Sequence, residues 1–355
     1  MDKPNPLPGI TSQILDTPRL KQHVLISGAA EDVPVIFLHG NFSAGLYFEE
    51  TMLALPAGFR GIAVDMRGYG WTEDKLIDAT RGYRDWVDDL AELMDALKIE
   101  KAHLVGWSAG CGTIYRFIAD HPGRVLSTTL ICPVSPYGFG GTRGVEGTPL
   151  FDDYAGSGGG VVNPEFVRRI AIQDRSADDA NSPRNVINTF YYVAPFRSLR
   201  EEDFLTAALM EKTGADRYPG DATPSANWPT VAPGVLGPVN AWSLKYHPHD
   251  AADLIQAAVK PPVLWVRGSH DMIVADNSMF DIAALGKLGY VPGWPGDEIA
   301  PPQPMIQQTR DVLTKYATNG GSFEEHVIQN TAHSPHIEKP AEFNALFHAF
   351  LHKAG

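Results

Sequence analysis

The stretch Ala102-His-Leu-Val-Gly-Trp-Ser-Ala-Gly110 decides the fold. It begins with an apolar run typical of a buried strand and ends in the pattern Gly-x-Ser-x-Gly, which opens a helical pattern. The small residues on both sides let the chain turn sharply from strand to helix, with Ser108 held at the turn in strained dihedrals. Such a turn exposes the serine hydroxyl at the carboxyl edge of a sheet, beside helix amides that favour developing negative charge. Ser108 is therefore the candidate nucleophile, and the plainer alternative is a Ser/Gly turn that only caps a helix.

Short apolar runs alternate with amphipathic helical patterns on both sides of this stretch. The runs lie at residues 34–38, 61–64, 102–105, 125–131, 262–266 and 323–328. One helical pattern spans residues 83–97 with a single apolar stripe, another follows Ser108 and stops before Pro122, and the last begins at Pro340. This alternation predicts right-handed βαβ units and a doubly wound, mostly parallel sheet, which is an α/β fold.

A serine nucleophile needs a base and a group that orients the base. Asp271 lies just past the run at 262–266, and His333 lies just past the run at 323–328. Because the carboxyl ends of parallel strands meet at one edge of a sheet, both side chains are expected beside Ser108. The chain order Ser, Asp, His is the one that this architecture imposes. We therefore expect His333 to act as the base and Asp271 to hold its imidazole.

Other residues compete for these two roles. His336 competes with His333 but lies further from the end of its strand, and Asp276 lies further into its loop than Asp271. His270, which precedes Asp271, is interpreted as a surface loop residue. We prefer Asp271 and His333.

These motifs together resemble the α/β-hydrolase-fold serine hydrolases over nearly the whole predicted core. The resemblance rests on Leu38-His-Gly-Asn41, Asp65-Met-Arg-Gly-Tyr-Gly70, Gly106-Trp-Ser-Ala-Gly110, Gly268-Ser-His-Asp271 and Ala332-His-Ser-Pro-His336. It implies an oxyanion hole built from the backbone N–H groups of Asn41 and Ala109, with Phe42 the second choice for the first of them. It implies no cofactor, and we expect no metal site.

The alternating pattern lapses over residues 135–258, a glycine-rich and then aromatic-rich stretch. We expect a mainly helical cap inserted into one hydrolase core made of residues 1–134 and 259–355. Residues 289–304 are rich in proline and are expected to form an additional lid-like loop.

An inserted cap in this fold lies over the active-site edge, and this one carries many aromatic and few charged side chains. Apolar walls suit a hydrophobic substrate, whereas the plainer alternative is that the aromatic residues form the cap's own core. The residues expected to contact substrate are Phe42, Trp107, Tyr191, Phe196 and Trp242. We predict hydrolysis of a small hydrophobic carboxylic ester or lactone through an acyl-enzyme. A C–C bond hydrolase, a cofactor-free perhydrolase and a small-lactone receptor with vestigial hydrolysis remain the alternatives.

Composition narrows the partners of the 355-residue chain. Its formal charge is −13 and it has no long run of Lys or Arg, which argues against nucleic acid. No stretch is apolar for long enough to cross a membrane, and the first residues do not resemble a signal peptide. Two cysteines cannot build a disulfide framework. We therefore expect a cytoplasmic protein without nucleic-acid or membrane partners.

Overall fold

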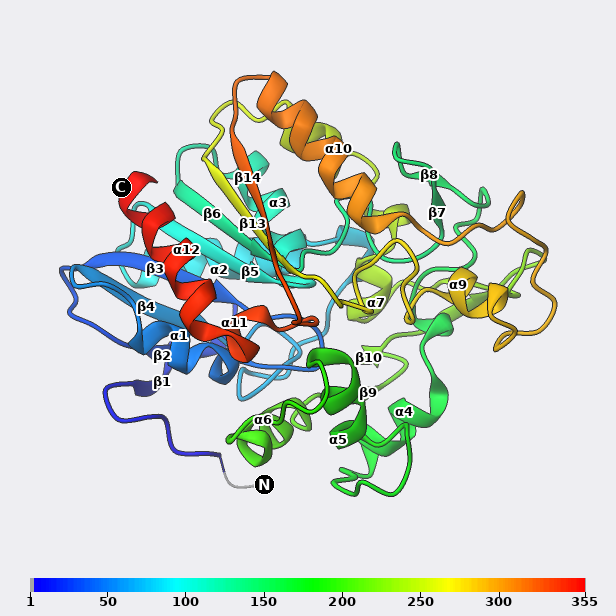
Figure 1. Ribbon diagram of the computed structural model, residues 1–355, viewed down its shortest axis with the longest axis horizontal. Helices are drawn as coiled ribbons and strands as arrows, with labels where there is room; N and C mark the ends of the chain where they lie inside the picture. Colours follow the sequence, from blue (N-terminus) through cyan, green and yellow to red (C-terminus); the bar gives the residue numbers. More distant parts are fainter. Residues whose placement is uncertain (1–2, 355) are drawn as a thin grey trace.

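The computed structural model describes residues 3–354 and is built around one eight-stranded sheet, with the strand order β1-β2-β4-β3-β5-β6-β13-β14 (Figure 1). The strands are β1 (Thr11–Asp16), β2 (Lys21–Ile26), β3 (Val33–Leu38), β4 (Phe59–Val64), β5 (Ala102–Trp107), β6 (Val125–Ile131), β13 (Val263–Gly268) and β14 (Phe323–Ile328). Strands β4, β3, β5, β6, β13 and β14 are parallel neighbours, whereas β1 and β2 pair antiparallel at one edge. The predicted mostly parallel sheet is confirmed.

The six predicted apolar runs all became strands of this sheet, within two residues at either end. The edge pair β1 and β2 was not predicted. Strand β1 is largely exposed, so it lacks the continuous apolar run of a strand that is covered on both faces.

Helices cover both faces of the sheet, as expected from the alternating pattern (Figure 1). The helix α12 (Pro340–Ala354) packs on β6 and β13, and its Phe347 ring meets the ring of Phe37 at 6.3 Å. Helices packed on one another cover the other face: α2 (Arg84–Ala96), α3 (Gly110–Asp120), α8 (Asp250–Ile255) and α10 (Met305–Thr318). The apolar stripe predicted for residues 83–97 is buried against this core.

The order of strands places a reversal of the winding between β3 and β5. The chain runs from β3 outward to β4 and then returns to the other side of β3 with β5. In open α/β sheets the crevice at such a reversal, outside the carboxyl ends of the strands, is where ligands bind. Asn41 follows β3 and Ser108 follows β5, so both lie at this point.

The chain between β6 and β13 adds no strand to the main sheet, and we call residues 135–258 the inserted segment. It contains α4 (Pro164–Ala171), α5 (Pro183–Val186), α6 (Glu201–Ala208), α7 (Pro238–Ala241) and α8. Three small two-stranded ladders accompany them: β7 (Thr142–Arg143) with β8 (Thr148–Pro149), β9 (Thr213–Gly214) with β10 (Tyr218–Pro219), and β11 (Ala222–Pro224) with β12 (Val231–Pro233). The ladders are too short to give a recognisable period in the sequence.

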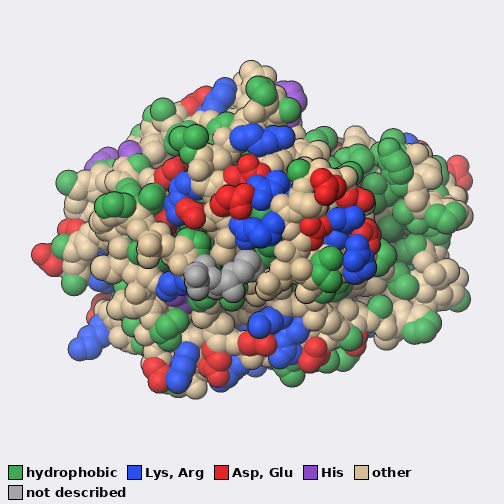
Figure 2. Space-filling view, turned by 90° about the horizontal axis from the view of Figure 1, so that it is seen from below, with side chains coloured by type: hydrophobic (Ala, Val, Ile, Leu, Met, Phe, Trp, Pro, Cys, Tyr) green, Lys and Arg blue, Asp and Glu red, His purple; other side chains and the backbone are tan. Residues whose placement is uncertain are grey.

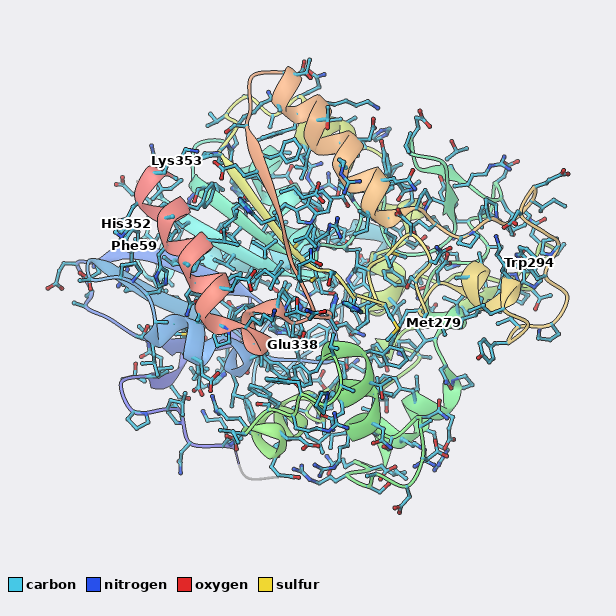
Figure 3. The ribbon with its side chains drawn as sticks, in the orientation of Figure 1. Phe59, Met279, Trp294, Glu338, His352 and Lys353 are labelled. Atoms are coloured by element: carbon cyan, nitrogen blue, oxygen red, sulfur yellow. The ribbon has the colours of Figure 1, made fainter. Side chains whose placement is uncertain are left out.

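Residues 289–304 join α9 (Ile282–Lys287) to α10 without helix or strand, at the right-hand end of Figure 1. The loop is held to the inserted segment by the Trp228 indole, which donates to the carbonyl oxygen of Pro292 at 3.0 Å. Trp294, labelled in Figure 3, donates within the loop to the carbonyl oxygen of Ala300.

Acidic and basic side chains are interspersed over the centre of the face seen from below, and hydrophobic side chains gather at its right-hand end (Figure 2). Within the inserted segment, acidic and basic side chains form ion pairs, such as Arg184 with Glu201 at 2.9 Å. Within residues 3–354, no helix combines the length and the apolar character needed to cross a membrane.

Candidate active site

Ser108 stands at a strained turn between β5 and α3. Its φ angle is +55°, and its amide donates to the carbonyl oxygen of Ile131 at the end of β6 at 2.9 Å. Steric crowding explains why the flanking residues are glycines. A Cβ on Gly110 would lie 2.4 Å from the carbonyl oxygen of Leu38, and one on Gly106 would lie 2.8 Å from the side chain of Ile114. The small residues of the Gly-x-Ser-x-Gly pattern therefore let this turn pack against the neighbouring strand and its own helix.

After three of the strands, a non-glycine residue near this point has a positive φ angle. Phe42 has φ +47° in the loop after β3, Ser108 has +55° after β5, and Cys132 has +44° after β6. Non-glycine residues rarely adopt this conformation, and such strain concentrates at functional sites.

Asp271 and His333 form a buried hydrogen-bonded pair. Asp271 Oδ2 lies 2.9 Å from His333 Nδ1, and the two side chains are only 4% and 3% exposed. The other carboxylate oxygen, Oδ1, accepts the amides of Ile273 at 2.8 Å and Val274 at 3.0 Å. These bonds fix the carboxylate, and the bond to Nδ1 leaves Nε2 as the ring nitrogen available to another group.

The loop that carries His333 is fastened to the strand that carries Ser108. The indole of Trp107, the residue before Ser108, donates to the carbonyl oxygen of His333 at 2.7 Å. Its ring also lies 5.6 Å from the imidazole of His333. Ser108 Oγ and His333 are not hydrogen-bonded in this structure, and catalytic bonds of this kind are often long until substrate binds.

The competing residues are engaged elsewhere. His336 is buried with its ring stacked on Phe48 at 5.2 Å, and burial lowers its pKa to about 3. Asp276 Oδ1 accepts the amide of Ile306 at 2.9 Å, in the first turn of α10. His270 is exposed and contacts its neighbour Ser269. Asp271 and His333 are the members of these alternatives that the structure brings together.

The loop after β3 lies directly against Ser108. A Cβ on Gly40 would lie 2.7 Å from the Ser108 Cβ. No described protein group accepts a hydrogen bond from the amides of Asn41 or Ala109, the two candidate oxyanion donors, and the same holds for Phe42. The loop is held by His39, whose Nε2 accepts the amide of Met66 at 3.0 Å while its Nδ1 meets the carbonyl oxygen of Gly40 at 2.7 Å.

Tyr191 of the inserted segment also holds this loop. Its hydroxyl donates to the carbonyl oxygens of Asn41 at 2.9 Å and Phe42 at 3.2 Å, and its ring lies 5.9 Å from that of His333. The inserted segment thus reaches both the candidate oxyanion loop and the candidate base.

The other residues that we expect to contact substrate do not all line one cavity. Trp242 and Tyr69 line a small cavity together with Gly40 and Ala109. Phe42 is buried against the Phe166 ring at 5.0 Å. Trp107 is fully buried, and Phe196 packs on the Tyr192 ring at 5.0 Å.

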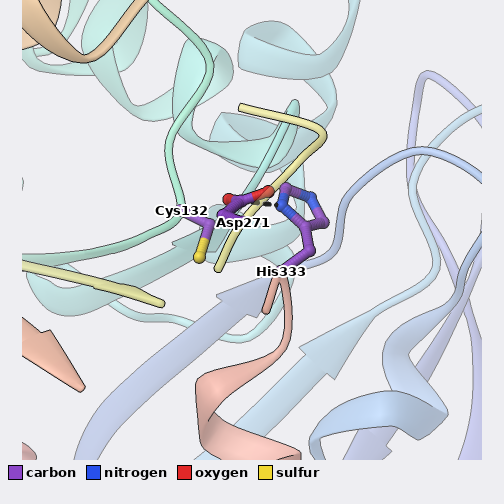
Figure 4. A group of neighbouring side chains, drawn as sticks. All are labelled: Cys132, Asp271 and His333. Atoms are coloured by element: carbon purple, nitrogen blue, oxygen red, sulfur yellow. Dashed lines mark hydrogen bonds and ion pairs between the residues drawn. The ribbon is translucent and has the colours of Figure 1, made fainter. Parts of the chain in front are cut away.

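Cys132 adjoins the Asp271–His333 pair (Figure 4). One donor atom from each of these three side chains lies within 4.8 Å of the others, which makes them the one potential metal-ligand group found in residues 3–354. A metal would need the thiolate, yet burial and the charge of Asp271 raise the pKa of the Cys132 thiol. The oxygens of Asp271 are already taken by two amides and His333. These donors therefore fit a hydrogen-bonded pair better than a metal site.

Glu338 is a residue of this region that the sequence patterns did not indicate. Its Oε2 accepts the amide of Ala332, next to His333, and its Oε1 accepts the amide of Val193 in the inserted segment, both at 2.6 Å. In Figure 3 it is labelled beside α11 (Pro335–Glu338), where that helix faces the inserted segment. Burial raises the pKa of Glu338 to about 7. A glutamate at the end of a short helix gives no local signal of such a contact.

Comparison with known proteins places this arrangement in a family. Residues 33–146 match the family model described as alpha/beta hydrolase fold. The 2-hydroxymuconate semialdehyde hydrolase of Pseudomonas sp. (strain CF600) is 30% identical over 207 residues, which cover 58% of this chain and 68% of that protein. An uncharacterized carboxylesterase, nap, of Bacillus subtilis (strain 168) is 26% identical over 192 residues, or 50% of this chain and 62% of that protein.

A solved structure extends the likeness over almost the whole chain. The serine hydrolase CCSP0084 from the polyaromatic hydrocarbon (PAH)-degrading bacterium Cycloclasticus zankles aligns with a TM-score of 0.60 and 18% identity, covering 97% of this chain and 98% of that one. At 18% identity, the similarity to this solved structure concerns the fold alone, whereas the two relatives above are similar in sequence. By sheet order, strand-end motifs and relatives together, the chain belongs to the α/β-hydrolase fold family.

Proposed function

We propose that this protein is a serine hydrolase that cleaves a small hydrophobic carboxylic ester or lactone. The observation that carries the proposal is the buried Asp271–His333 pair, 2.9 Å apart, fastened by Trp107 to the strained turn that presents Ser108. A nucleophile, a base and an orienting acid are the three roles that acyl transfer on serine requires.

In this mechanism His333 Nε2 accepts the Ser108 proton while Oγ attacks the carbonyl carbon of the ester. Asp271 holds Nδ1–H and stabilises the imidazolium that forms. The amides of Ala109 and of Asn41 or Phe42 stabilise the oxyanion. The imidazolium then gives its proton to the departing alkoxide, leaving an acyl group on Ser108. Water, deprotonated by His333, attacks this acyl group and releases the carboxylic acid and free Ser108.

The inserted segment acts as the cap in this proposal. Tyr191 and Trp242 come from it, and they contact the loop after β3 and the cavity beside Ala109. Aromatic rings around a few polar groups favour a substrate ester whose acyl or alcohol part is apolar. The similarity to a carboxylesterase supports hydrolysis of an ester as the reaction.

The test is active-site labelling combined with an ester series. The protein is incubated with a fluorophosphonate and analysed by mass spectrometry, and p-nitrophenyl esters of increasing chain length are assayed. We expect one adduct on Ser108, and turnover that Ser108→Ala reduces by about 10⁶ where background permits. Ser322→Ala, at an exposed serine, is the matched control and is expected to retain full activity. Absence of an adduct on Ser108 would overturn the proposal.

Hydrolysis of a carbon–carbon bond is a second candidate, because a 2-hydroxymuconate semialdehyde hydrolase is among the relatives. The same labelling would succeed in that case. Rapid cleavage of a vinylogous diketone, with only slow turnover of every p-nitrophenyl ester, would favour this second reaction. A protein that is labelled at Ser108 but turns over neither substrate class would favour a receptor.

A further inference from the structure

Tyr191 contacts two loops of the candidate site at once. Its hydroxyl donates to the carbonyl oxygens of Asn41 at 2.9 Å and Phe42 at 3.2 Å, in the loop after β3. Its own carbonyl oxygen accepts the amide of Ser334, the residue after His333, at 3.0 Å. One residue of the inserted segment therefore bridges the candidate oxyanion loop and the loop that carries the candidate base.

The surroundings of Tyr191 hold it in place. The residue is 5% exposed, and its ring meets the Trp107 ring edge-on with centroids 5.3 Å apart. The Trp107 indole in turn donates to the carbonyl oxygen of His333 at 2.7 Å. Two residues after Tyr191, the amide of Val193 donates to Glu338 at 2.6 Å and anchors the same stretch of chain. Burial raises the pKa of the Tyr191 hydroxyl well above its ordinary value, so the hydroxyl keeps the proton that it donates.

The carbonyl groups of the loop after β3 determine where its amides point. A trans peptide is planar, so a carbonyl group and the amide of the next residue point in opposite directions within one plane. The carbonyl oxygen of Gly40 accepts the Ser43 hydroxyl at 2.8 Å, which orients the amide of Asn41 from within the core. The carbonyl oxygen of Asn41 accepts the Tyr191 hydroxyl, which orients the amide of Phe42 from the inserted segment. Both amides considered as the oxyanion donor of this loop are thus oriented from behind by a hydrogen bond.

Phe42 needs such support because its backbone is strained. Its φ angle of +47° lies in the left-handed region, and a non-glycine residue stays there only where the surrounding structure over-determines it. The two carbonyl groups that Tyr191 contacts belong to the two peptide units on either side of the Phe42 Cα, so the hydroxyl restrains both. Removal of one oxyanion donor costs about 10²–10³ in kcat, so the orientation of these amides matters for the rate.

We propose that Tyr191 is a positioning residue, whose hydroxyl holds the oxyanion amides of the loop after β3 at a fixed place relative to His333. This inference rests on the proposed serine hydrolysis, because it assigns a role in stabilising the oxyanion of that reaction. The hydroxyl has a single proton, which two carbonyl oxygens already share, so substrate would gain this donor only by displacing them. Its effect is expected on kcat, where charge develops, and not on binding of the uncharged ester.

The first experiment compares Tyr191→Phe with Tyr192→Phe in the hydrolysis of p-nitrophenyl butyrate. Tyr191→Phe keeps the ring and the backbone bond to Ser334 and removes only the hydroxyl. Because a displacement of about 1 Å can cost about 10² in rate, we expect kcat to fall by about 10–10², with KM changed by less than about threefold. Tyr192 is also buried, and its hydroxyl has no hydrogen-bond partner among residues 3–354, so Tyr192→Phe should keep the parent kcat. Unchanged kcat in Tyr191→Phe, or a rise in KM that accounts for the whole loss of kcat/KM, overturns the inference.

The second experiment separates positioning from stability. The Tyr47 hydroxyl also joins the core to the inserted segment, by donating to the carbonyl oxygen of Phe204 at 3.0 Å. Tyr47→Phe should therefore lower the thermal unfolding midpoint to an extent similar to Tyr191→Phe, yet leave kcat unchanged. Equal losses of kcat in these two variants would assign the effect to stability and contradict positioning.

If Tyr191→Phe does not fold, para-aminophenylalanine in place of Tyr191 still decides. Its amino group retains an N–H donor at the same point of the ring, so this variant should retain most of the parent kcat. A loss as large as that expected for Tyr191→Phe would show that a donor at this point does not support the rate.

The third experiment follows the rate at which a fluorophosphonate labels Ser108, a step that uses the base and the oxyanion amides but needs no turnover. Tyr191→Phe should be labelled more slowly than the parent protein, by a factor similar to its loss of kcat. Absence of an adduct on Ser108 in the parent would reject the proposed hydrolysis. Labelling of the parent, with equal labelling and turnover rates in Tyr191→Phe, would reject only the role of Tyr191.

Discussion

At the scale of single residues, the site depends on very close packing of backbone around Ser108. Gly40, Gly106 and Gly110 each occupy positions where a Cβ would meet a neighbouring atom at 2.8 Å or less. Positive φ at Ser108 adds strain that the surrounding strands must hold. Small changes here are expected to alter the reaction more than the fold.

Gly40→Ala tests this packing. The new methyl group would lie 2.7 Å from Ser108 Cβ, 3.2 Å from the carbonyl oxygen of Trp107 and 3.4 Å from Ser108 Oγ. Because displacement of a reacting group by about 1 Å can cost about 10² in rate, we expect kcat to fall by about that factor. Gly58→Ala, at a glycine with φ +87° and open surroundings, would place a Cβ in a strained backbone conformation and should destabilise the fold without this loss of kcat. Unchanged kcat in Gly40→Ala would contradict the packing argument.

Asp271→Asn tests the assignment of the acid. The asparagine oxygen can still accept the amides of Ile273 and Val274, so the loop should keep its structure. Its NH₂ group would favour the wrong tautomer of His333, and kcat is expected to fall by about 10⁴. Asp276→Asn is the matched comparison, and esterase assays with circular dichroism measure both variants. A larger loss of kcat in Asp276→Asn would reverse the assignment.

At the scale of secondary-structure elements, Glu338 joins the end of α11 to two loops. It accepts the amide of Val193 in the inserted segment and the amide of Ala332 beside the candidate base. Strand β14 and helix α11 thereby position His333 relative to the inserted segment.

Glu338 should also give the stability a pH dependence. Burial raises the pKa of this carboxyl group from 4.5 to about 7 in the folded protein. The folded state therefore binds the proton more tightly than the unfolded state, and this contribution to stability is complete below about pH 4.5 and is lost as the pH rises through about 7. In Glu338→Gln, the decline of the thermal midpoint across that interval should be smaller. Equal declines in the two proteins would contradict this role.

At the scale of the whole molecule, the inserted segment and the core are tied by several buried contacts. The rings of Tyr47 and Phe204 stack with centroids 4.3 Å apart, and Arg200 pairs with the fully buried Glu49 at 2.6 Å. Tyr191 and Glu338 add the hydrogen bonds described above. These contacts join residues that are about 150 positions apart in the chain.

Arg200→Leu should destabilise the protein strongly. It would leave Glu49 buried without its counter-ion, and breaking such a pair costs about 3–5 kcal/mol. Urea unfolding, followed by circular dichroism, measures the change in unfolding free energy. Arg197→Leu, at an exposed arginine of the same segment, should change it by less than about 0.5 kcal/mol. Addition of Glu49→Leu to Arg200→Leu should restore part of the stability, and failure to do so would argue against the buried pair.

Much of the core was predictable because its signals are local. Six buried strands are continuous apolar runs, and the helix over residues 84–96 carries one apolar stripe. The sequence patterns did not indicate β1, which is largely exposed, or β2, in which two of the four buried residues, Gln22 and His23, are polar. Asp271 and His333 were predictable as candidates because each directly follows a strand that ends at the same edge of the sheet.

By itself, then, the sequence determined six strands of the main sheet, the helices that begin near residues 84, 110 and 340, and the turn at Ser108, since apolar periodicity and small residues act over a few neighbouring positions. Only the tertiary structure decided which side chains of the inserted segment meet the core. The hydrogen bonds of Glu338 with Val193 and of Tyr191 with Asn41 join parts of the chain that no local pattern relates. Such contacts follow from how the inserted segment packs on the core.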